Sequence, residues 1–128
     1  MDLNAQELAY IGDAVYEIYI RKYLINKKIR KVNNLQKEAK KYVSAMGQST
    51  SLKNMIDNDF LSEKEIDIVK NARNFKTASK PKNSDIITYK YATALEALIG
   101  YLYLNNDKNR INEIMKYILE DMENVCIW

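Results

Sequence analysis

Residues 89–102 read YKYATALEALIGYL, and this stretch decides the fold class because it is apolar around almost the whole circumference of a helix. We therefore predict a central helix over about residues 86–104 that is buried on most sides. The low content of glycine (3) and proline (1) among 128 residues, with 47% hydrophobic residues, favours long helices over loops. The sequence thus predicts an all-α helical bundle, with residues 1–128 forming a single domain around one core.

Helical patterns flank this central segment on both sides. Residues 9–21 read AYIGDAVYEIYIR, and we expect the first helix over about residues 5–24, with Asn4 and Glu7 as a capping pair at its start. A second helical stretch is expected from Asn33 or Asn34 onward, interrupted or bent near Gly47. The remaining expectations are a helix opened by the capping pair Ser62 and Glu65, a loop over residues 74–85, a turn over residues 105–107, and a final amphipathic helix.

The residue types present exclude several classes of protein. Histidine is absent, which removes catalytic triads that need a histidine base and histidine-rich zinc sites. The single cysteine, Cys126, cannot form an internal disulfide, and no signal-peptide pattern opens the chain, so we expect a reducing, cytoplasmic setting. No apolar run approaches the roughly 20 residues of a membrane span. We therefore expect no membrane partner.

Two carboxylates interrupt apolar helical stretches, Asp13 in the first helix and Glu96 in the central one. A charge carried into a buried segment costs several kcal/mol unless it is paired, so each carboxylate needs a partner. One explanation is an ion pair with a nearby lysine or arginine. The other is that both bind one Mg²⁺, which prefers oxygen ligands and supports attack of water on phosphate. Gly12 and Gly100 lie near these acids and favour a close helix–helix contact there.

The two acidic stretches carry a resemblance to a known family. Residues 9–21 resemble the signature helix of the ribonuclease III family, and residues 89–102 resemble the helix with its second acidic motif. With the intervening RNFKTASKPKNSD at residues 73–85, the sequence is similar to Mini-ribonuclease III, in which the catalytic domain has no separate module for binding double-stranded RNA. This resemblance covers nearly the whole chain.

The resemblance implies a ribonuclease III-type fold and a Mg²⁺-dependent endoribonuclease, a hydrolase that cuts double-stranded RNA as a homodimer. By position, Asp13 matches the family's catalytic aspartate and Glu96 its metal-binding glutamate. Further acids of the larger family members would fall at Gln6, Ala9 and Thr93, which leaves the number of metal ions open. The implied substrate is a precursor of large-subunit (23S) ribosomal RNA, with a ribosomal protein as a possible assistant.

Basic residues are the candidates for holding RNA, because duplex RNA is bound largely through its phosphates and shape. The net charge of +3 is itself weak support for a polyanionic partner, so the local distribution matters more. Residues 70–84 contain no acid, and a second basic cluster follows helical spacing. The candidate RNA-binding residues are Lys70, Arg73, Lys76, Lys80 and Lys82 in the first group and Lys37, Lys40 and Lys41 in the second.

Two other functions are compatible with the sequence. The first is a catalytically inactive dimeric module of the same fold that binds RNA or the ribosome. It would have no need for Asp13 and Glu96 in apolar helices, so these residues favour the enzyme. The second is a helical interaction protein that does not bind RNA, which would leave the acid-free basic segment unexplained.

Overall fold

The computed structural model describes residues 3–75 and 85–126, with side chains described as far as residue 120. This part of the chain forms six α-helices and contains no strand, which confirms the prediction of an all-α fold. The helices are α1 (Ala5–Asn26), α2 (Val32–Val43), α3 (Ala45–Asp57), α4 (Glu63–Arg73), α5 (Ile86–Leu104) and α6 (Lys108–Cys126). None of these helices is both long and apolar enough to cross a lipid bilayer.

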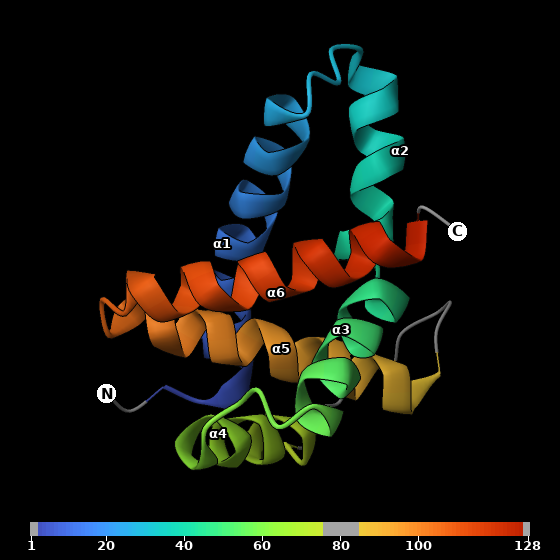
Figure 1. Ribbon diagram of the computed structural model, residues 1–128. Coiled ribbons are helices and arrows are strands. Elements are labelled where there is room, and N and C mark those ends of the chain that lie inside the picture. Colours follow the sequence, from blue (N-terminus) through green and yellow to red (C-terminus); the bar gives the residue numbers. More distant parts are fainter. Residues whose placement is uncertain (1–2, 76–84, 127–128) are drawn as a thin grey trace.

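Helix α5 is the centre of the molecule, as its apolar sequence predicts. Helices α1, α3, α4 and α6 all pack against it, and α1 does so most extensively. Its residues Leu95, Leu98 and Ile99 are fully buried. Figure 1 shows α1 and α2 as an arm that rises away from α5, whereas α3 and α4 lie on the opposite side. The lower part of α1 therefore meets α5 at the base of this arm.

Side-chain caps fix where α1, α3, α4 and α5 begin, whereas α2 begins without one. Asn4 and Glu7 form the expected capping box at α1, and Ser62 and Glu65 form the one at α4. The interruption expected near Gly47 is present, and the break between α2 and α3 lies at Ser44. Ser44 is extended and its side chain accepts a hydrogen bond from the backbone nitrogen of Gly47 at 3.1 Å. The serine cap, and not the glycine, ends one helix and starts the next.

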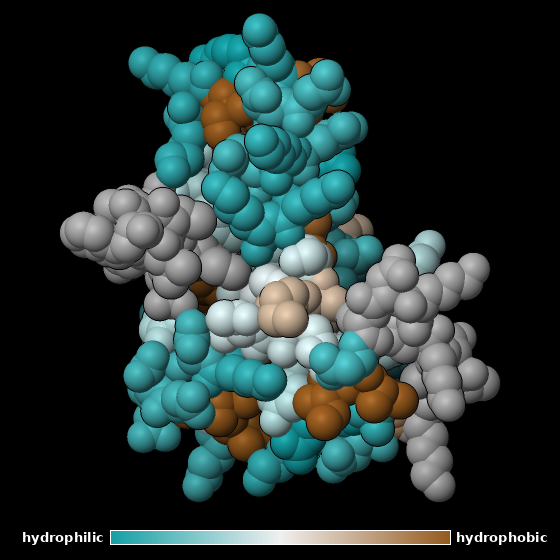
Figure 2. Space-filling view, turned by 90° about the vertical axis from the view of Figure 1, so that its right-hand side faces the viewer, coloured by the Kyte–Doolittle hydropathy of each residue, from teal (hydrophilic) through white to brown (hydrophobic). Residues whose placement is uncertain are grey.

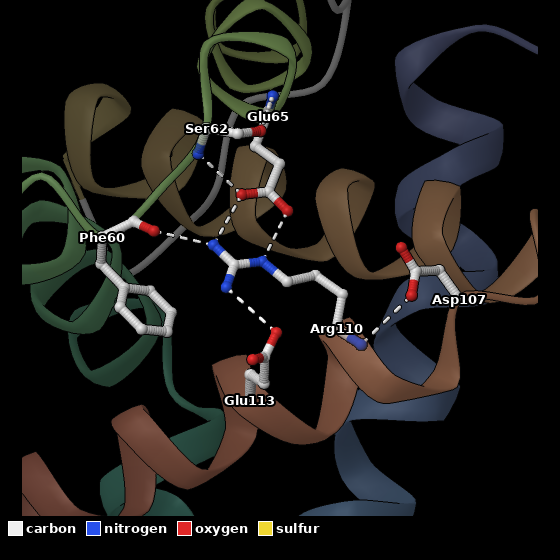
Figure 3. Close-up of polar contacts among 6 residues, drawn as sticks. All are labelled: Phe60, Ser62, Glu65, Asp107, Arg110 and Glu113. Carbon is white, nitrogen blue, oxygen red and sulfur yellow. Dashed lines mark hydrogen bonds and ion pairs between the residues drawn. The ribbon is translucent and has the colours of Figure 1, made fainter.

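Arg110 anchors the start of α6 to two other parts of the chain (Figure 3). Its guanidinium donates to both carboxylate oxygens of Glu65 at 2.8 Å and to the carbonyl of Phe60 at 2.7 Å. It also lies over the Phe60 ring, 4.6 Å from the ring centre, and pairs with Glu113 at 3.3 Å. Glu65 thus serves as a capping residue and as an ion-pair partner, so the start of α6 is held against the start of α4.

Candidate active site

The site begins at a close crossing of α1 and α5 that two glycines permit. A β-carbon added to Gly12 would collide with the backbone carbonyl of Glu96, and one added to Gly100 would collide with that of Leu8. Any other residue at either position would force the helices apart. This arrangement confirms the close helix–helix contact expected from the two glycines, and it brings the backbone of Glu96 next to the residue that precedes Asp13.

The crossing places the carboxylates of Asp13 and Glu96 within hydrogen-bonding distance of each other. Burial raises the pKa of Glu96 to about 8, and its contact with the Asp13 carboxyl group adds to this rise. The negative charge of Glu17, one turn further along α1, acts in the same direction. Two carboxylates in contact repel each other when both are ionised, so the pair has a strong electrostatic demand for a cation.

The structure corrects one expectation about these acids. Glu96 is half-buried, as expected, but Asp13 is exposed, because it lies on the outer face of α1 beside Ala14. The ion-pair explanation is not supported either: among the residues that the structure describes, neither acid pairs with a lysine or arginine. Glu17 does have such a partner, Arg21 at 3.1 Å, as expected for a surface glutamate.

Two neutral polar side chains, those of Gln48 and Tyr16, lie near Glu96 on its buried side. The amide nitrogen of Gln48 on α3 donates to Glu96 Oε2 at 3.4 Å. The hydroxyl of Tyr16, on α1, donates to the carbonyl of Tyr42 at 2.7 Å. Burial raises the pKa of Tyr16, and the charge of Glu96 adds to the rise, so the phenol stays neutral beside the acid. The sequence reasoning missed Gln48, because a lone glutamine in a stretch without acids gives no signal of its own.

The positions that carry further acids in larger family members lie close together. Gln6 and Thr93 line one small cavity of about 20 Å³ between α1, α4 and α5, and Ala9 is buried nearby on α1. None of the three supplies a carboxylate. Among the described residues, no group of three or more acids, histidines or cysteines is arranged to hold a metal.

The acidic pair nevertheless fits a hard divalent cation. Mg²⁺ is commonly held by one or two carboxylates and keeps several waters as its other ligands. Asp13 and Glu96 offer carboxylate oxygens at a partly open surface, and no described lysine or arginine competes for them. The donor set therefore suits Mg²⁺ better than Zn²⁺, which favours nitrogen and sulfur ligands.

The candidate RNA-binding residues are only partly covered by the structure. Lys76, Lys80 and Lys82, with most of the expected loop over residues 74–85, lie outside the described residues. Arg73 ends α4, where its guanidinium contacts the Tyr91 hydroxyl at 3.5 Å and lies 5.8 Å from the centre of its ring. A lysine that sequence reasoning did not single out, Lys53 on α3, lies over the same ring at 4.9 Å. Neither cation has a carboxylate partner in the described part of the chain.

The second basic group lies on α2, away from the contact of Arg73 with Tyr91. Lys37, Lys40 and Lys41 are all exposed, and Lys41 pairs with Glu38 at 2.9 Å. Hydrophilic side chains cover the upper part of the molecule in Figure 2, where α2 lies. Of the predicted basic residues that the structure describes, Lys37, Lys40 and Lys41 thus lie on α2, whereas Lys70 and Arg73 lie at the end of α4.

Comparisons with known proteins agree with this fold. A family model described as "Ribonuclease III domain" matches residues 6–107. The crystal structure of a Fusobacterium nucleatum protein superposes on the chain with a TM-score of 0.82 and 37% identity, and the match covers 94% of each chain. The chain therefore belongs to the ribonuclease III family, whose members are generally metal-dependent.

Curated relatives define its place within the family. Mini-ribonuclease 3 of Streptococcus pneumoniae is 40% identical over 121 residues, or 94% of each chain. Mini-ribonuclease 3 of Brevibacillus brevis is 47% identical over 113 residues, which cover 88% of this chain and 83% of the relative. Within the family the chain groups with Mini-ribonuclease 3, and it is an endoribonuclease of the ribonuclease III type. The resemblance seen in residues 9–21 and 89–102 is confirmed.

Proposed function

We propose that this chain hydrolyses phosphodiester bonds of double-stranded RNA, with Asp13 and Glu96 holding Mg²⁺. The observation that carries the proposal is the contact between these two carboxylates, which no described cation neutralises. A pair of this kind is costly in a structural role, since it raises the pKa of Glu96 to about 8. The cost is understandable if Asp13 and Glu96 would normally hold a divalent cation. In this proposal residues 1–128 act as one catalytic domain.

The protein's own groups would act mainly by holding the cation in place and by excluding bulk water from the site. When bound, Mg²⁺ supplies a Lewis acid that offsets the charge developing on the scissile phosphate and makes water a better nucleophile. Asp13, on the exposed face of α1, would meet the substrate side of the site. Glu96 would hold the cation on the buried side of the site, where the phenol of Tyr16 and the amide of Gln48 exclude bulk water.

We further propose that the substrate is held by a basic surface of this domain. Lys53 and Arg73 flank the Tyr91 ring and have no described carboxylate partner, so they are available to phosphate groups. Phosphate contacts of this type supply most of the affinity for duplex RNA and make it salt-dependent. Replacing both with glutamine should weaken RNA binding and reduce its salt dependence by about one phosphate per residue. Lys37, Lys40 and Lys41 on α2 are the alternative residues for binding the RNA phosphates.

We take the natural substrate to be a precursor of 23S ribosomal RNA in the cytoplasm, with a ribosomal protein as an assisting partner. This assignment comes from the family resemblance. It would be tested by sequencing the ends of 23S RNA in cells that lack the gene. Unchanged ends in those cells would contradict it.

The proposal as a whole is tested by cleavage assays with purified protein. Duplex RNA, single-stranded RNA and duplex DNA are each incubated with Mg²⁺ and with a chelator. We expect cleavage of duplex RNA alone, dependent on Mg²⁺ and lost in Asp13→Asn and Glu96→Gln. If the wild-type protein binds duplex RNA but never cleaves it, the chain is instead a catalytically inactive RNA-binding module.

A further inference from the structure

Gln48 is the one glutamine of the described chain that is buried beside the acidic pair. Its side chain lies on the first turn of α3, is only 3% exposed, and donates from Nε2 to Glu96 Oε2 at 3.4 Å. Burying an amide costs free energy unless it is hydrogen-bonded. The contact with Glu96, on a helix far away in the sequence, is therefore a specific one.

The backbone that carries Gln48 has little freedom to move. The backbone nitrogen of Gln48 donates to the carbonyl of Ser44 at 3.0 Å, and the Ser44 side chain caps the same turn. Gly47 packs so closely on the carbonyl of Lys41 that a β-carbon there would collide with it. The start of α3 is thus locked against the end of α2, and the amide of Gln48 reaches Glu96 from a fixed point.

A neutral donor is the suitable group at this position. Asp13 lies against Glu96, and two ionised carboxylates tend to turn away from each other. An amide N–H can hold one carboxylate oxygen in place without neutralising it. A lysine or arginine there would pair with Glu96 and compete with a divalent cation, whereas a glutamate would add a third repelling charge.

We propose that Gln48 is a positioning residue, whose amide holds the Glu96 carboxylate in the orientation that lets it bind a divalent cation together with Asp13. The inference rests on the proposed function. It assigns Gln48 no contact with RNA or with the reacting atoms. Partners that orient metal ligands in this way typically contribute roughly 10–100-fold to metal affinity or activity.

The test compares Gln48→Met, which keeps the volume and removes the donor, with Ser51→Ala as a matched control. Ser51 lies one turn further along α3, is 2% exposed, and its hydroxyl has no hydrogen-bond partner among the described residues. Mn²⁺ alone is titrated into each RNA-free protein, and free Mn²⁺ is followed by electron paramagnetic resonance. We expect Gln48→Met to weaken Mn²⁺ binding roughly tenfold or more. Ser51→Ala should bind Mn²⁺ like the wild type.

Cleavage kinetics supply the second readout. In Gln48→Met we expect the Mg²⁺ concentration for half-maximal cleavage to rise and kcat to fall, with KM for duplex RNA nearly unchanged. If that variant does not fold, as judged by circular dichroism, Gln48→Leu replaces it. Wild-type Mn²⁺ affinity and Mg²⁺ dependence in the folded variant would overturn the inference, and a lower Tm alone would make Gln48 a core residue only. A wild-type protein that neither binds Mn²⁺ nor cleaves duplex RNA would overturn the proposed function instead.

Discussion

The Glu96 carboxylate makes the metal-free protein sensitive to alkaline pH. Its pKa is raised from 4.5 to about 8 in the folded protein, so folding favours the protonated form. The contribution of Glu96 to the stability of the folded protein is therefore fully present below about pH 4.5, and it is lost as the pH rises through 8. Glu96→Gln removes this loss. In chelator, we expect its Tm to match the wild type near pH 4 and to exceed it by several degrees near pH 8, on the scale of a few kcal/mol.

Thermal unfolding followed by circular dichroism across this pH range checks the prediction. Glu38→Gln is the control, since Glu38 lies in an exposed pair with Lys41 and its loss should change the Tm little at any pH. Saturating Mg²⁺ should reverse the order by stabilising the wild type alone. A Glu96→Gln protein that is less stable than the wild type in chelator at alkaline pH would contradict the strained acidic pair.

At the residue scale, the sequence singled out the two acids that the structure brings together, but it gave no indication of their surroundings. Asp13 and Glu96 stood out because each interrupts apolar residues, and the structure brings them into contact. Nothing in the pattern around Asp13 distinguishes a buried position from the exposed one it occupies, because Gly12 and Ala14 on either side are both small. Gln48 could not be found, since its role depends on the packing of α3 against α5.

The close crossing of α1 and α5 at the two glycines predicts the direction in which a glycine-to-alanine substitution changes stability. An alanine in place of a helical glycine normally stabilises a protein by up to about 1 kcal/mol. Gly12→Ala should do the opposite, because the new methyl group meets the backbone carbonyl of Glu96. We expect a loss of about 1–3 kcal/mol and a large fall in cleavage, since α1 and α5 must separate where the carboxylates meet. Urea unfolding and cleavage below the lower Tm are the measurements, and an unchanged or higher stability would show that the helices adapt.

The Arg110 anchor between helices gives a second prediction. Burial alone would raise the pKa of Glu65, but the hydrogen bonds from Arg110 and from the backbone of Ser62 hold it below its ordinary 4.5. Arg110→Met leaves the Glu65 carboxylate buried without its cation, and we expect a cost of about 3 kcal/mol near neutral pH. A pKa that is lowered in the folded protein contributes stability above 4.5 and loses it as the pH falls through the folded value. The difference between wild type and variant should therefore shrink as the pH falls below 4.5.

The matched control for Arg110 is Arg21→Met. Arg21 also pairs with a glutamate, Glu17 one turn earlier on α1, but the Arg21 side chain is 71% exposed. Exposed pairs contribute roughly 0–1 kcal/mol, so this variant should be nearly neutral at every pH. Chemical unfolding of both variants between acid and neutral pH would decide, and equal effects would mean that Arg110 is not a structural anchor.

At the element scale, the helices were largely predictable and their junctions were not. Capping boxes are local in sequence, so those of Asn4 with Glu7 and Ser62 with Glu65 were read correctly. The break was expected near Gly47, because glycine is the usual sign of a bend, and it lies at Ser44. Its actual role is close packing on the carbonyl of Lys41, a contact that no sequence pattern specifies.

At the scale of the whole molecule, a row of exposed apolar side chains on one face of α1 bears on the homodimer that the family resemblance implies. Tyr10, Ile18 and Ile25 are 84%, 65% and 52% exposed, and they follow one another along the same helix that carries Asp13. Apolar side chains that are exposed in a row along one helix favour a protein contact. A twofold dimer formed through this face would place two acidic pairs along one RNA duplex, one for each strand.

We therefore predict that Ile18→Lys together with Ile25→Lys converts a dimer into a monomer. In a twofold symmetric interface the same surface of each copy faces the other, so the lysines introduced on the two copies would lie close together and repel each other. Met46→Lys is the matched control, because Met46 is 64% exposed on α3, away from this face. Sedimentation velocity at micromolar concentration should give a dimer for the wild type and for Met46→Lys, and a monomer for the double variant. The monomer should also lose coordinated cleavage of both strands, since a single acidic pair meets only one strand at a time. A wild-type protein that is monomeric while it cleaves duplex RNA would contradict the homodimer, whereas a double variant that stays dimeric would place the interface on another face.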